Sequence, residues 1–182
     1  ILADVTGHGI PAALIAAMVK IAFSVQKGSL GNPSQVLSEM NEILCGKTRN
    51  HYITAAYLYY DFTSRTLRYA SAGHPPMIVL RSDGHVESFK PKGTILACFN
   101  GRTFEACDFL MNPGDRLLVF TDGMIESRNN LGEMYGEEKF MQFLEENRGL
   151  KIGAFADRIL NEFEGWVDED PDDDFALFVL DA

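Results

Sequence analysis

The chain begins with the segment ILADVTGHGIPAALIAAM, residues 1–18. It opens with a short apolar run that ends at Asp4, turns through Gly7 and Gly9, and continues with apolar and small residues at helical spacing. Only three residues precede Asp4, whereas a strand usually has about five or six. The segment predicts a strand with a carboxylate at its end and a helix directly behind it, and we expect the sequence to start inside a domain.

Two helices are predicted in succession after this turn. The first is indicated by apolar residues at helical spacing, namely Ile10, Leu14, Ala17, Met18, Ile21 and Val25. The second lies within residues 32–46, where Asn32 is the candidate N-cap, Pro33 suits the first turn and Gly46 ends the helix. The chain therefore begins with a strand followed by a helical pair.

Short β-like runs separated by turn residues come next, at residues 53–62, 66–73, 76–84, 86–90, 102–110 and 115–123. We predict that they form an antiparallel meander. Helical spacing returns in residues 136–147 and 152–166, and residues 174–180 read as a buried closing strand. The order helices, sheet, helices, strand favours an α+β fold, with helices layered on sheet, over a regularly alternating parallel sheet.

The composition is that of one soluble globular domain, which we assign to residues 1–182. With 16 basic and 26 acidic residues the net charge is −10, which argues against a nucleic-acid surface and is compatible with cation binding. The three cysteines have no CxxC spacing, so neither a disulfide framework nor a zinc site is indicated. No membrane span or signal peptide is recognised, and we expect a cytoplasmic protein without membrane contact.

Carboxylates are predicted at the ends of three strands. Asp4 ends the first, Asp122 follows the strand RLLVFT, and residues 168–174 place six carboxylates in seven residues before the last strand. If those strands are neighbours, Asp4 and Asp122 could meet one or two of the last three aspartates, Asp172, Asp173 and Asp174. Such a cluster repels itself unless it is solvated, protonated or neutralised, and oxygen ligands without His or Cys suit Mg²⁺ or Mn²⁺.

A plainer interpretation exists for each of these carboxylates. An aspartate before glycine, as at Asp122, is most often a turn residue, and Asp4 could begin a turn as well. An acidic run such as residues 168–174 is most often a solvated loop. From spacing alone, both the metal site and the solvated turns remain open.

Five motifs carry a family resemblance: ADVTGHGIPAAL, YASAGHPPMIVLRSDG, PGDRLLVFTDGMIESRN, YGEEKF and DDDFALFVL. In this order and approximate spacing they resemble bacterial PPM-type serine/threonine protein phosphatases, in the branch of stage II sporulation protein E (SpoIIE) and the sigma-B regulatory phosphatases. The resemblance runs from Leu2 to Leu180. It implies a four-layer α/β/β/α sandwich with a two-metal centre between the sheets.

The resemblance also implies roles for residues. Asp4 matches the aspartate that bridges both metals, and the carbonyl of Val5 contributes to one of them. Asp122 matches the aspartate of the TDG motif, Asp173 the first aspartate of the closing pair, and Asp174 its neighbour. The implied cofactor is Mn²⁺ or Mg²⁺, binuclear in the complete domain, and the aspartates act as its ligands rather than as nucleophiles.

Two histidines fall in matching motifs. A structural or second-layer role is favoured for His8 over proton donation, because a proton donor needs reach to the substrate. His74 is expected to stabilise a turn, since Gly73 and two prolines mark a tight connection there. Gly7, Gly9 and Gly123 are expected to let the backbone turn sharply beside the bound ion.

One family motif is absent from the 182 residues. The family carries a GGDFYD-like strand upstream of the aspartate that Asp4 matches, and its own aspartate binds the second metal. The chain is therefore expected to be an N-terminally incomplete fragment, or else to have an incomplete second site. Missing strands would leave sheet edges to be covered by dimerisation, swapping or disorder, so a homodimer is one expected arrangement.

The implied activity is hydrolysis of phosphoserine or phosphothreonine without a covalent enzyme intermediate. The expected substrate is a phosphorylated STAS-domain anti-sigma-factor antagonist in bacterial partner switching, under control of an upstream sensor or receiver domain. Two alternatives remain: a catalytically silent PPM-like interaction module, and an unrelated α+β domain with an acidic cation-binding loop. A fragment of an active enzyme is favoured because Asp4, Asp122 and Asp173 are all retained.

Overall fold

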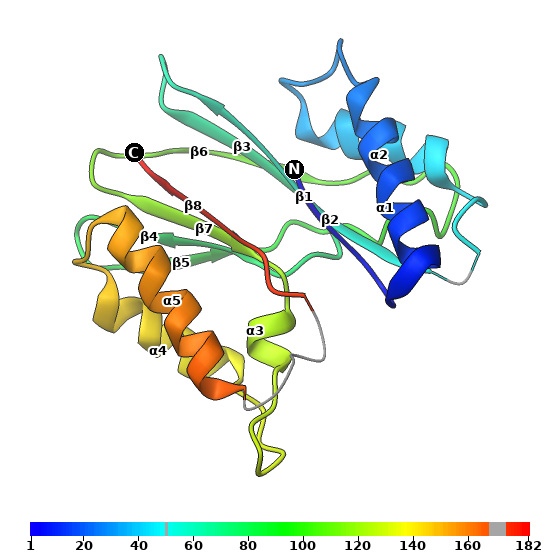
Figure 1. Ribbon diagram of the computed structural model, residues 1–182. Helices are drawn as coiled ribbons and strands as arrows, with labels where there is room; N and C mark the ends of the chain where they lie inside the picture. Colours follow the sequence, from blue (N-terminus) through cyan, green and yellow to red (C-terminus); the bar gives the residue numbers. More distant parts are fainter. Residues whose placement is uncertain (50, 168–173) are drawn as a thin grey trace. The chain divides into compact units, whose positions relative to one another are not determined.

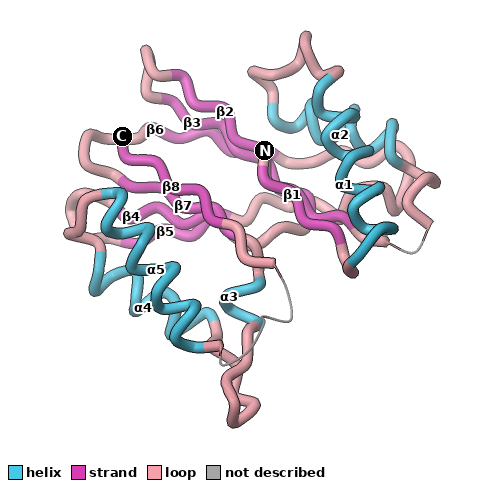
Figure 2. The backbone as a smooth tube through the Cα atoms, in the orientation of Figure 1, coloured by secondary structure: helices cyan, strands magenta, loops and turns pink. Residues whose placement is uncertain are grey.

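The computed structural model describes residues 1–49, 51–167 and 174–182. The chain divides into two compact units, each with one four-stranded sheet (Figures 1 and 2). Unit 1 consists of Ile1–Pro76 and Phe89–Met111, and unit 2 of Met77–Ser88 and Asn112–Ala182. Each unit is described by itself below.

Unit 1 is a sheet in the order β1-β2-β3-β6 with two helices on it. Its elements are β1 (Leu2–Val5), α1 (Gly9–Ser24), α2 (Pro33–Leu44), β2 (Ile53–Asp61), β3 (Thr66–Ala72) and β6 (Ala106–Leu110). Every strand pair is antiparallel. The predicted N-cap of α2 is confirmed, because the Asn32 side chain accepts a hydrogen bond from the Gln35 N–H at 3.3 Å.

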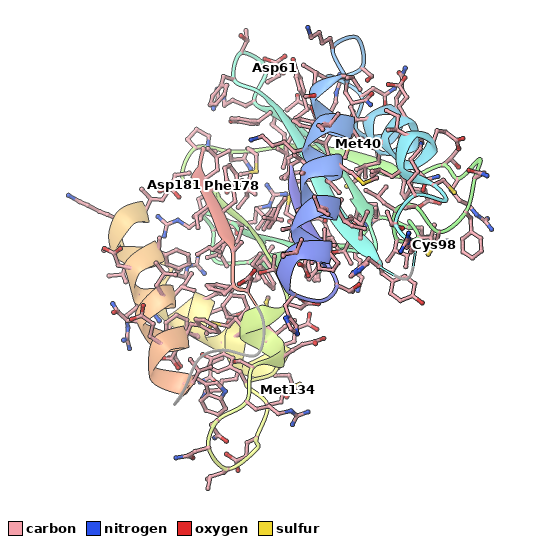
Figure 3. All side chains as sticks on the ribbon, turned by 45° about the vertical axis from the view of Figure 1, so that its right-hand side comes forward. Met40, Asp61, Cys98, Met134, Phe178 and Asp181 are labelled. Carbon is pink, nitrogen blue, oxygen red and sulfur yellow. The ribbon has the colours of Figure 1, made fainter. Side chains whose placement is uncertain are left out.

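The core of unit 1 lies between the two helices and the strands. Buried side chains of α1, α2, β2 and β3 form one cluster there, and Met40 of α2, labelled in Figure 3, is fully buried in it. From α1 the buried residues are Ala12, Ile15, Val19 and Ala22. The helical pair predicted after the first turn therefore covers the sheet of unit 1.

The apolar residues that predict α1 do not mark its buried side. Ile10, Leu14 and Ile21 are 78%, 63% and 63% exposed, and Val25 just beyond the helix is 58% exposed. The helix is thus correctly predicted, but it is apolar on two sides. Periodicity alone could not tell which of the two sides packs on the sheet.

Unit 2 is a sheet in the order β5-β4-β7-β8 with its own helices. Its elements are β4 (Met77–Leu80), β5 (Val86–Phe89), β7 (Arg116–Phe120), α3 (Gly123–Glu126), α4 (Glu137–Asn147), α5 (Ile152–Trp166) and β8 (Leu177–Asp181). Aromatic residues dominate its core, where Phe120 of β7 packs against Phe140 of α4 at 4.9 Å between ring centroids. Phe155 and Phe163 of α5 complete the same cluster.

The prediction of one meander for residues 53–123 is wrong. Strands β2, β3 and β6 belong to the sheet of unit 1, whereas β4, β5 and β7 belong to that of unit 2. Alternating apolar and polar residues identify a strand without naming its partner, and consecutive strands are neighbours only about two-thirds of the time. The α+β assignment, with helices layered on antiparallel pairs, holds within each unit.

The turn between β1 and α1 uses two glycines in the left-handed region. Gly7 has φ +92° and Gly9 has φ +78°, as expected for a sharp turn beside Asp4. A Cβ at Gly7 would lie 3.5 Å from the His51 ring, whereas a Cβ at Gly9 would meet nothing within 4 Å. At Gly9 the requirement for glycine is therefore one of backbone conformation alone.

We predict that Gly9→Ala lowers the free energy of unfolding by about 1–2 kcal/mol, because a side chain disfavours the left-handed conformation by that amount. Urea denaturation measures this. Gly28→Ala is the matched control, since Gly28 has no positive φ and a Cβ there would also meet nothing within 4 Å. Equal stability of the two variants would contradict the strained-turn argument.

Candidate metal centre

The first half of the candidate site is the end of β1, in unit 1. Asp4 is half-buried and lies opposite Thr54 in the β1–β2 pairing. The pairing continues past the strand, because the Thr6 N–H donates to the Tyr52 carbonyl at 3.0 Å and the Tyr52 N–H donates to Thr6 Oγ1 at 2.9 Å. The backbone that carries Asp4 and Val5 is thereby fixed to β2.

His74 supports this end of the sheet from inside unit 1. Its side chain is fully buried, with Nδ1 2.9 Å from Thr54 Oγ1, and its backbone N–H donates to Ser71 Oγ at 3.2 Å. Gly73 before it has φ +67°, and a Cβ there would lie 2.7 Å from Ile95 Cγ2. His74 therefore sits in the tight connection expected for it and also holds the threonine that faces Asp4.

His8 has a different environment. It is exposed and occupies the N-cap position of α1, with φ −134° and no hydrogen bond from its side chain to the helix. A structural role for His8 stays a prediction.

The second half of the site is in unit 2, where the TDG motif meets the segment before β8. The Thr121 hydroxyl donates to the Asp174 carbonyl at 3.0 Å and accepts from the Ala176 N–H at 2.8 Å. The Thr121 N–H also donates to the Ala176 carbonyl at 3.0 Å. These three bonds extend the antiparallel β7–β8 pairing beyond Phe120 and bring Asp122 and Asp174 to one edge of the sheet.

Gly123 allows the two segments to touch. A Cβ at this position would lie 2.6 Å from the Asp174 carbonyl oxygen, closer than any side chain tolerates. Gly123 was expected to serve a sharp turn, but it has no positive φ, and its role is this close backbone approach. Asp122 is the N-cap residue of α3, yet its half-buried carboxylate makes no capping hydrogen bond.

The structure therefore locates the predicted ligands in two groups. Asp4 and Val5 lie at the end of β1 in unit 1, and Asp122 and Asp174 lie at the β7–β8 edge in unit 2. Asp172 and Asp173 fall outside the described residues. That the two groups share one metal centre stays a prediction, and within residues 1–49, 51–167 and 174–182 no three His, Cys, Asp or Glu side chains gather as a metal site.

The donor set agrees with the expected metals. Carboxylates and one backbone carbonyl are hard oxygen ligands, which Mg²⁺ and Mn²⁺ prefer.

Sequence reasoning missed the supporting residues Thr121 and Thr54. The only available signal was the hydroxyl residue directly before Asp122, and nothing in the sequence pointed to Thr54. In the part of the chain that the structure describes, no helix is both long and apolar enough to cross a bilayer.

Comparison with known proteins gives a consistent picture. The sequence model of the stage II sporulation protein E (SpoIIE) family matches residues 1–182. Phosphoserine phosphatase RsbU of Bacillus subtilis is 29% identical over 181 residues, covering 98% of this chain and 54% of that protein. Phosphoserine phosphatase RsbP of the same organism is 30% identical over 131 residues, covering 69% of this chain and 32% of that protein. The chain thus spans about half the length of the first of these relatives, and less of the second.

Solved structures share the fold. The SiaA-PP2C domain of Pseudomonas aeruginosa superposes with a TM-score of 0.83 at 20% identity, covering 99% of this chain and 73% of that one. The PP2C phosphatase domain of Bacillus subtilis SpoIIE, solved with a fragment of its regulatory domain, gives a TM-score of 0.75 at 17% identity, covering 99% and 54%. These likenesses confirm the predicted PPM-type fold.

We predict that Gly123→Ala destabilises unit 2, because the new methyl group must push the Asp174 carbonyl away from Thr121. The expected loss in unfolding free energy is about 1–3 kcal/mol, as for other overpacked sites, measured by urea denaturation. Gly165→Ala on α5 is the control, since a Cβ there meets nothing within 4 Å, and its stability should be unchanged or higher. A Gly123→Ala variant as stable as this control would contradict the close-approach argument.

Proposed function

The chain belongs to the SpoIIE family, and we propose that it is the catalytic domain of a metal-dependent serine/threonine phosphoprotein phosphatase. The observation that carries the proposal is the junction held by Thr121. It places Asp122 and Asp174, from two separate family motifs, at one edge of a sheet. If Asp122 lay in a solvated turn and Asp174 in an unconnected acidic loop, no buried threonine would be needed to join the two segments and no glycine would be needed to let them touch.

The residues proposed to hold the metals are Asp4, Asp122, Asp173 and Asp174, with the carbonyl of Val5. When bound, two divalent ions supply an activated water for in-line attack and neutralise charge on the phosphoryl group. The chain's own contribution is to hold the ligand-bearing backbone in position. The β1–β2 pairing fixes Asp4 and Val5, and the Thr121 bonds fix the backbone of Asp174 beside Asp122.

The aspartates are proposed as ligands and not as nucleophiles, so hydrolysis needs no covalent enzyme intermediate. The positions of Asp4, Asp122 and Asp174 near strand ends suit this role, because hydrogen bonds to a neighbouring strand or segment hold the backbone there. Removing one carboxylate should accordingly abolish metal-dependent turnover without unfolding the chain.

The proposed substrate is a phosphorylated STAS-domain protein that acts in partner switching and sigma-factor regulation. Family likeness supports this step: the relative RsbU is a phosphoserine phosphatase, and the chain of one structural neighbour contains the RsbU and RsbW domains of Rv1364c from Mycobacterium tuberculosis. We further propose a cytoplasmic location and control by an upstream sensor or receiver domain.

A catalytically silent interaction module is the second candidate. The two candidates differ in turnover, so the experiments below separate them.

We predict that the chain binds Mn²⁺ or Mg²⁺ with a millimolar to micromolar dissociation constant, measured by isothermal titration calorimetry. Asp122→Asn should weaken Mn²⁺ binding at least tenfold, because it removes one anionic ligand. Asp157→Asn, an exposed aspartate on α5, is the matched control and should bind as the parent chain does. No binding at millimolar Mn²⁺, or equal binding by both variants, would remove the metal assignment.

We predict that this chain hydrolyses p-nitrophenyl phosphate poorly, whereas the full-length product of its gene shows Mn²⁺-dependent turnover on that substrate and on a phosphorylated STAS-domain protein. In the full-length protein, Asp122→Ala should lower kcat by orders of magnitude and leave the melting temperature without metal unchanged or slightly higher, since a repelling carboxylate is gone.

Two results would contradict these proposals, the first the activity and the second the ligand role of Asp122. A full-length protein that is inactive on every phosphoprotein tried would favour the silent module. Full Mn²⁺-dependent activity of Asp122→Ala would show that the carboxylate is not a ligand.

A further inference from the structure

The pairing of β1 with β2 changes at Thr6 and Tyr52, the pair that follows Val5 and Ile53 in the register. In an antiparallel ladder a hydrogen-bonded residue pair exchanges two backbone bonds, one in each direction. The first is present, because the Thr6 N–H donates to the Tyr52 carbonyl at 3.0 Å. The second is replaced, because the Tyr52 N–H donates to the Thr6 hydroxyl at 2.9 Å. A side chain thus takes the place of the Thr6 carbonyl in the ladder.

The Thr6 carbonyl has another donor, the ring of His51. It lies 2.7 Å from His51 Nδ1, and since a carbonyl only accepts, Nδ1 carries the proton. The His51 backbone is itself anchored, because its N–H donates to the Thr48 carbonyl at 3.0 Å. The ring lies against Gly7, where a Cβ would be 3.5 Å from Cε1 and 3.6 Å from Nδ1. We call Thr6, His51 and Tyr52 the β1 clip.

The β1 clip fixes the peptide groups on both sides of Thr6. The N–H of the Val5–Thr6 peptide points at β2, and in a trans peptide the carbonyl points the opposite way. The Val5 carbonyl, a proposed metal ligand, is therefore directed away from β2, and β1 is the first strand in the order β1-β2-β3-β6. The next peptide, Thr6–Gly7, is held by His51, and the chain then turns through Gly7 at φ +92°.

The clip compensates for the turn. Rotating the Thr6–Gly7 peptide out of the ladder takes the backbone acceptor from the Tyr52 N–H and the backbone donor from the Thr6 carbonyl. The Thr6 hydroxyl and the His51 ring replace them. Because Thr6 is exposed, water could also satisfy these two groups. Water would not hold the two peptides in one orientation, and a carbonyl that binds a metal needs a fixed orientation.

We propose that His51 is a positioning residue of the metal centre. Through its bond to the Thr6 carbonyl, it holds the end of β1 in the orientation in which the Val5 carbonyl and the Asp4 carboxylate bind the ion. The proposal rests on the proposed function and adds to it a residue that lies in none of the five motifs of the family resemblance.

The tautomer of His51 tests the contact without metal. At about pH 8.5 histidine side chains are neutral and carry a single ring proton. Nitrogen-15 NMR of the chain should find that proton on Nδ1 of His51, since the Thr6 carbonyl can only accept. A proton on Nε2 would overturn the proposal, because the ring could then not donate to Thr6.

The affinity for Mn²⁺ tests the positioning role. His51→Leu should weaken binding roughly three- to tenfold in isothermal titration calorimetry, which corresponds to the loss of one hydrogen bond. His51→Asn should restore most of the affinity, because its side-chain nitrogen is as far from the backbone as Nδ1 and also donates. His85→Leu is the matched control, at an exposed histidine between β4 and β5, and should bind as the parent chain does.

A second pair of variants tests the other bond of the β1 clip. Thr6→Val removes the hydroxyl that accepts from the Tyr52 N–H, whereas Thr6→Ser keeps a hydroxyl at the same position. Thr6→Val should weaken Mn²⁺ binding as His51→Leu does, and Thr6→Ser should bind as the parent chain does. Circular dichroism and the melting temperature of each metal-free variant measure any effect on folding.

The outcomes separate this proposal from the metal centre itself. If His51→Leu binds Mn²⁺ as tightly as His85→Leu and lowers only the melting temperature, the β1 clip serves folding alone and the proposal is overturned, while the metal centre stands. If His51→Asn binds no better than His51→Leu, the donor at Nδ1 is not the cause and the proposal is overturned as well. A parent chain that binds no Mn²⁺ would overturn the metal centre, and this proposal with it.

Discussion

The hydroxyl of Thr121 is the contact on which the candidate site of unit 2 depends. It accepts one hydrogen bond and donates another, so that a single buried side chain ties the strand before Asp122 to the segment after Asp173. Each such bond contributes only about 1 kcal/mol. Their importance is positional, because they hold the backbone of Asp174 beside the strand that leads to Asp122, next to Phe175, whose ring packs against Phe163 at 4.9 Å between centroids. Gly123 completes the fit by leaving room for the Asp174 carbonyl.

The two groups of candidate ligands, one in each unit, are supported in a similar way. In each, a carboxylate lies near the end of a strand, and a threonine hydroxyl makes a bond next to it: Thr121, before Asp122, bonds to the Asp174 carbonyl, and Thr54, opposite Asp4, bonds to the His74 ring. A threonine side chain is short and restricted at χ1, so it holds its partner with little freedom. Carboxylates that repel each other without metal need this kind of support from neutral groups, because a charged neighbour would compete with the cation.

The sequence was a good guide to elements and a poor guide to their partners. Helices and strands were predicted closely, down to the Asn32 cap and the limits of α5, because caps, turns and periodicity are local signals. The division of residues 53–123 between two sheets was missed, because strand pairing depends on contacts between distant residues. For α1 the apolar period was real, yet its most prominent residues face away from the core. The candidate ligands were found through motif resemblance, and spacing alone left them indistinguishable from solvated turns. The residues that support them, Thr54, Thr121 and Gly123, act through contacts with residues distant in the sequence, which no spacing rule describes.

The segments of the two units alternate in the sequence: residues 77–88 belong to unit 2, and they precede residues 89–111, which complete unit 1. During synthesis, β4 and β5 therefore leave the ribosome before β6, the strand that completes the sheet of unit 1, and the other strands of their own sheet, β7 (Arg116–Phe120) and β8 (Leu177–Asp181), follow later. A strand cannot pair before its neighbour exists. Unit 1 can close its sheet once residue 110 has emerged, whereas the β7–β8 edge with Asp122 and Asp174 is assembled only at the end of translation. A nascent chain thus acquires the ligands of its second half last, and neither unit can be passed on in evolution as one uninterrupted stretch of gene.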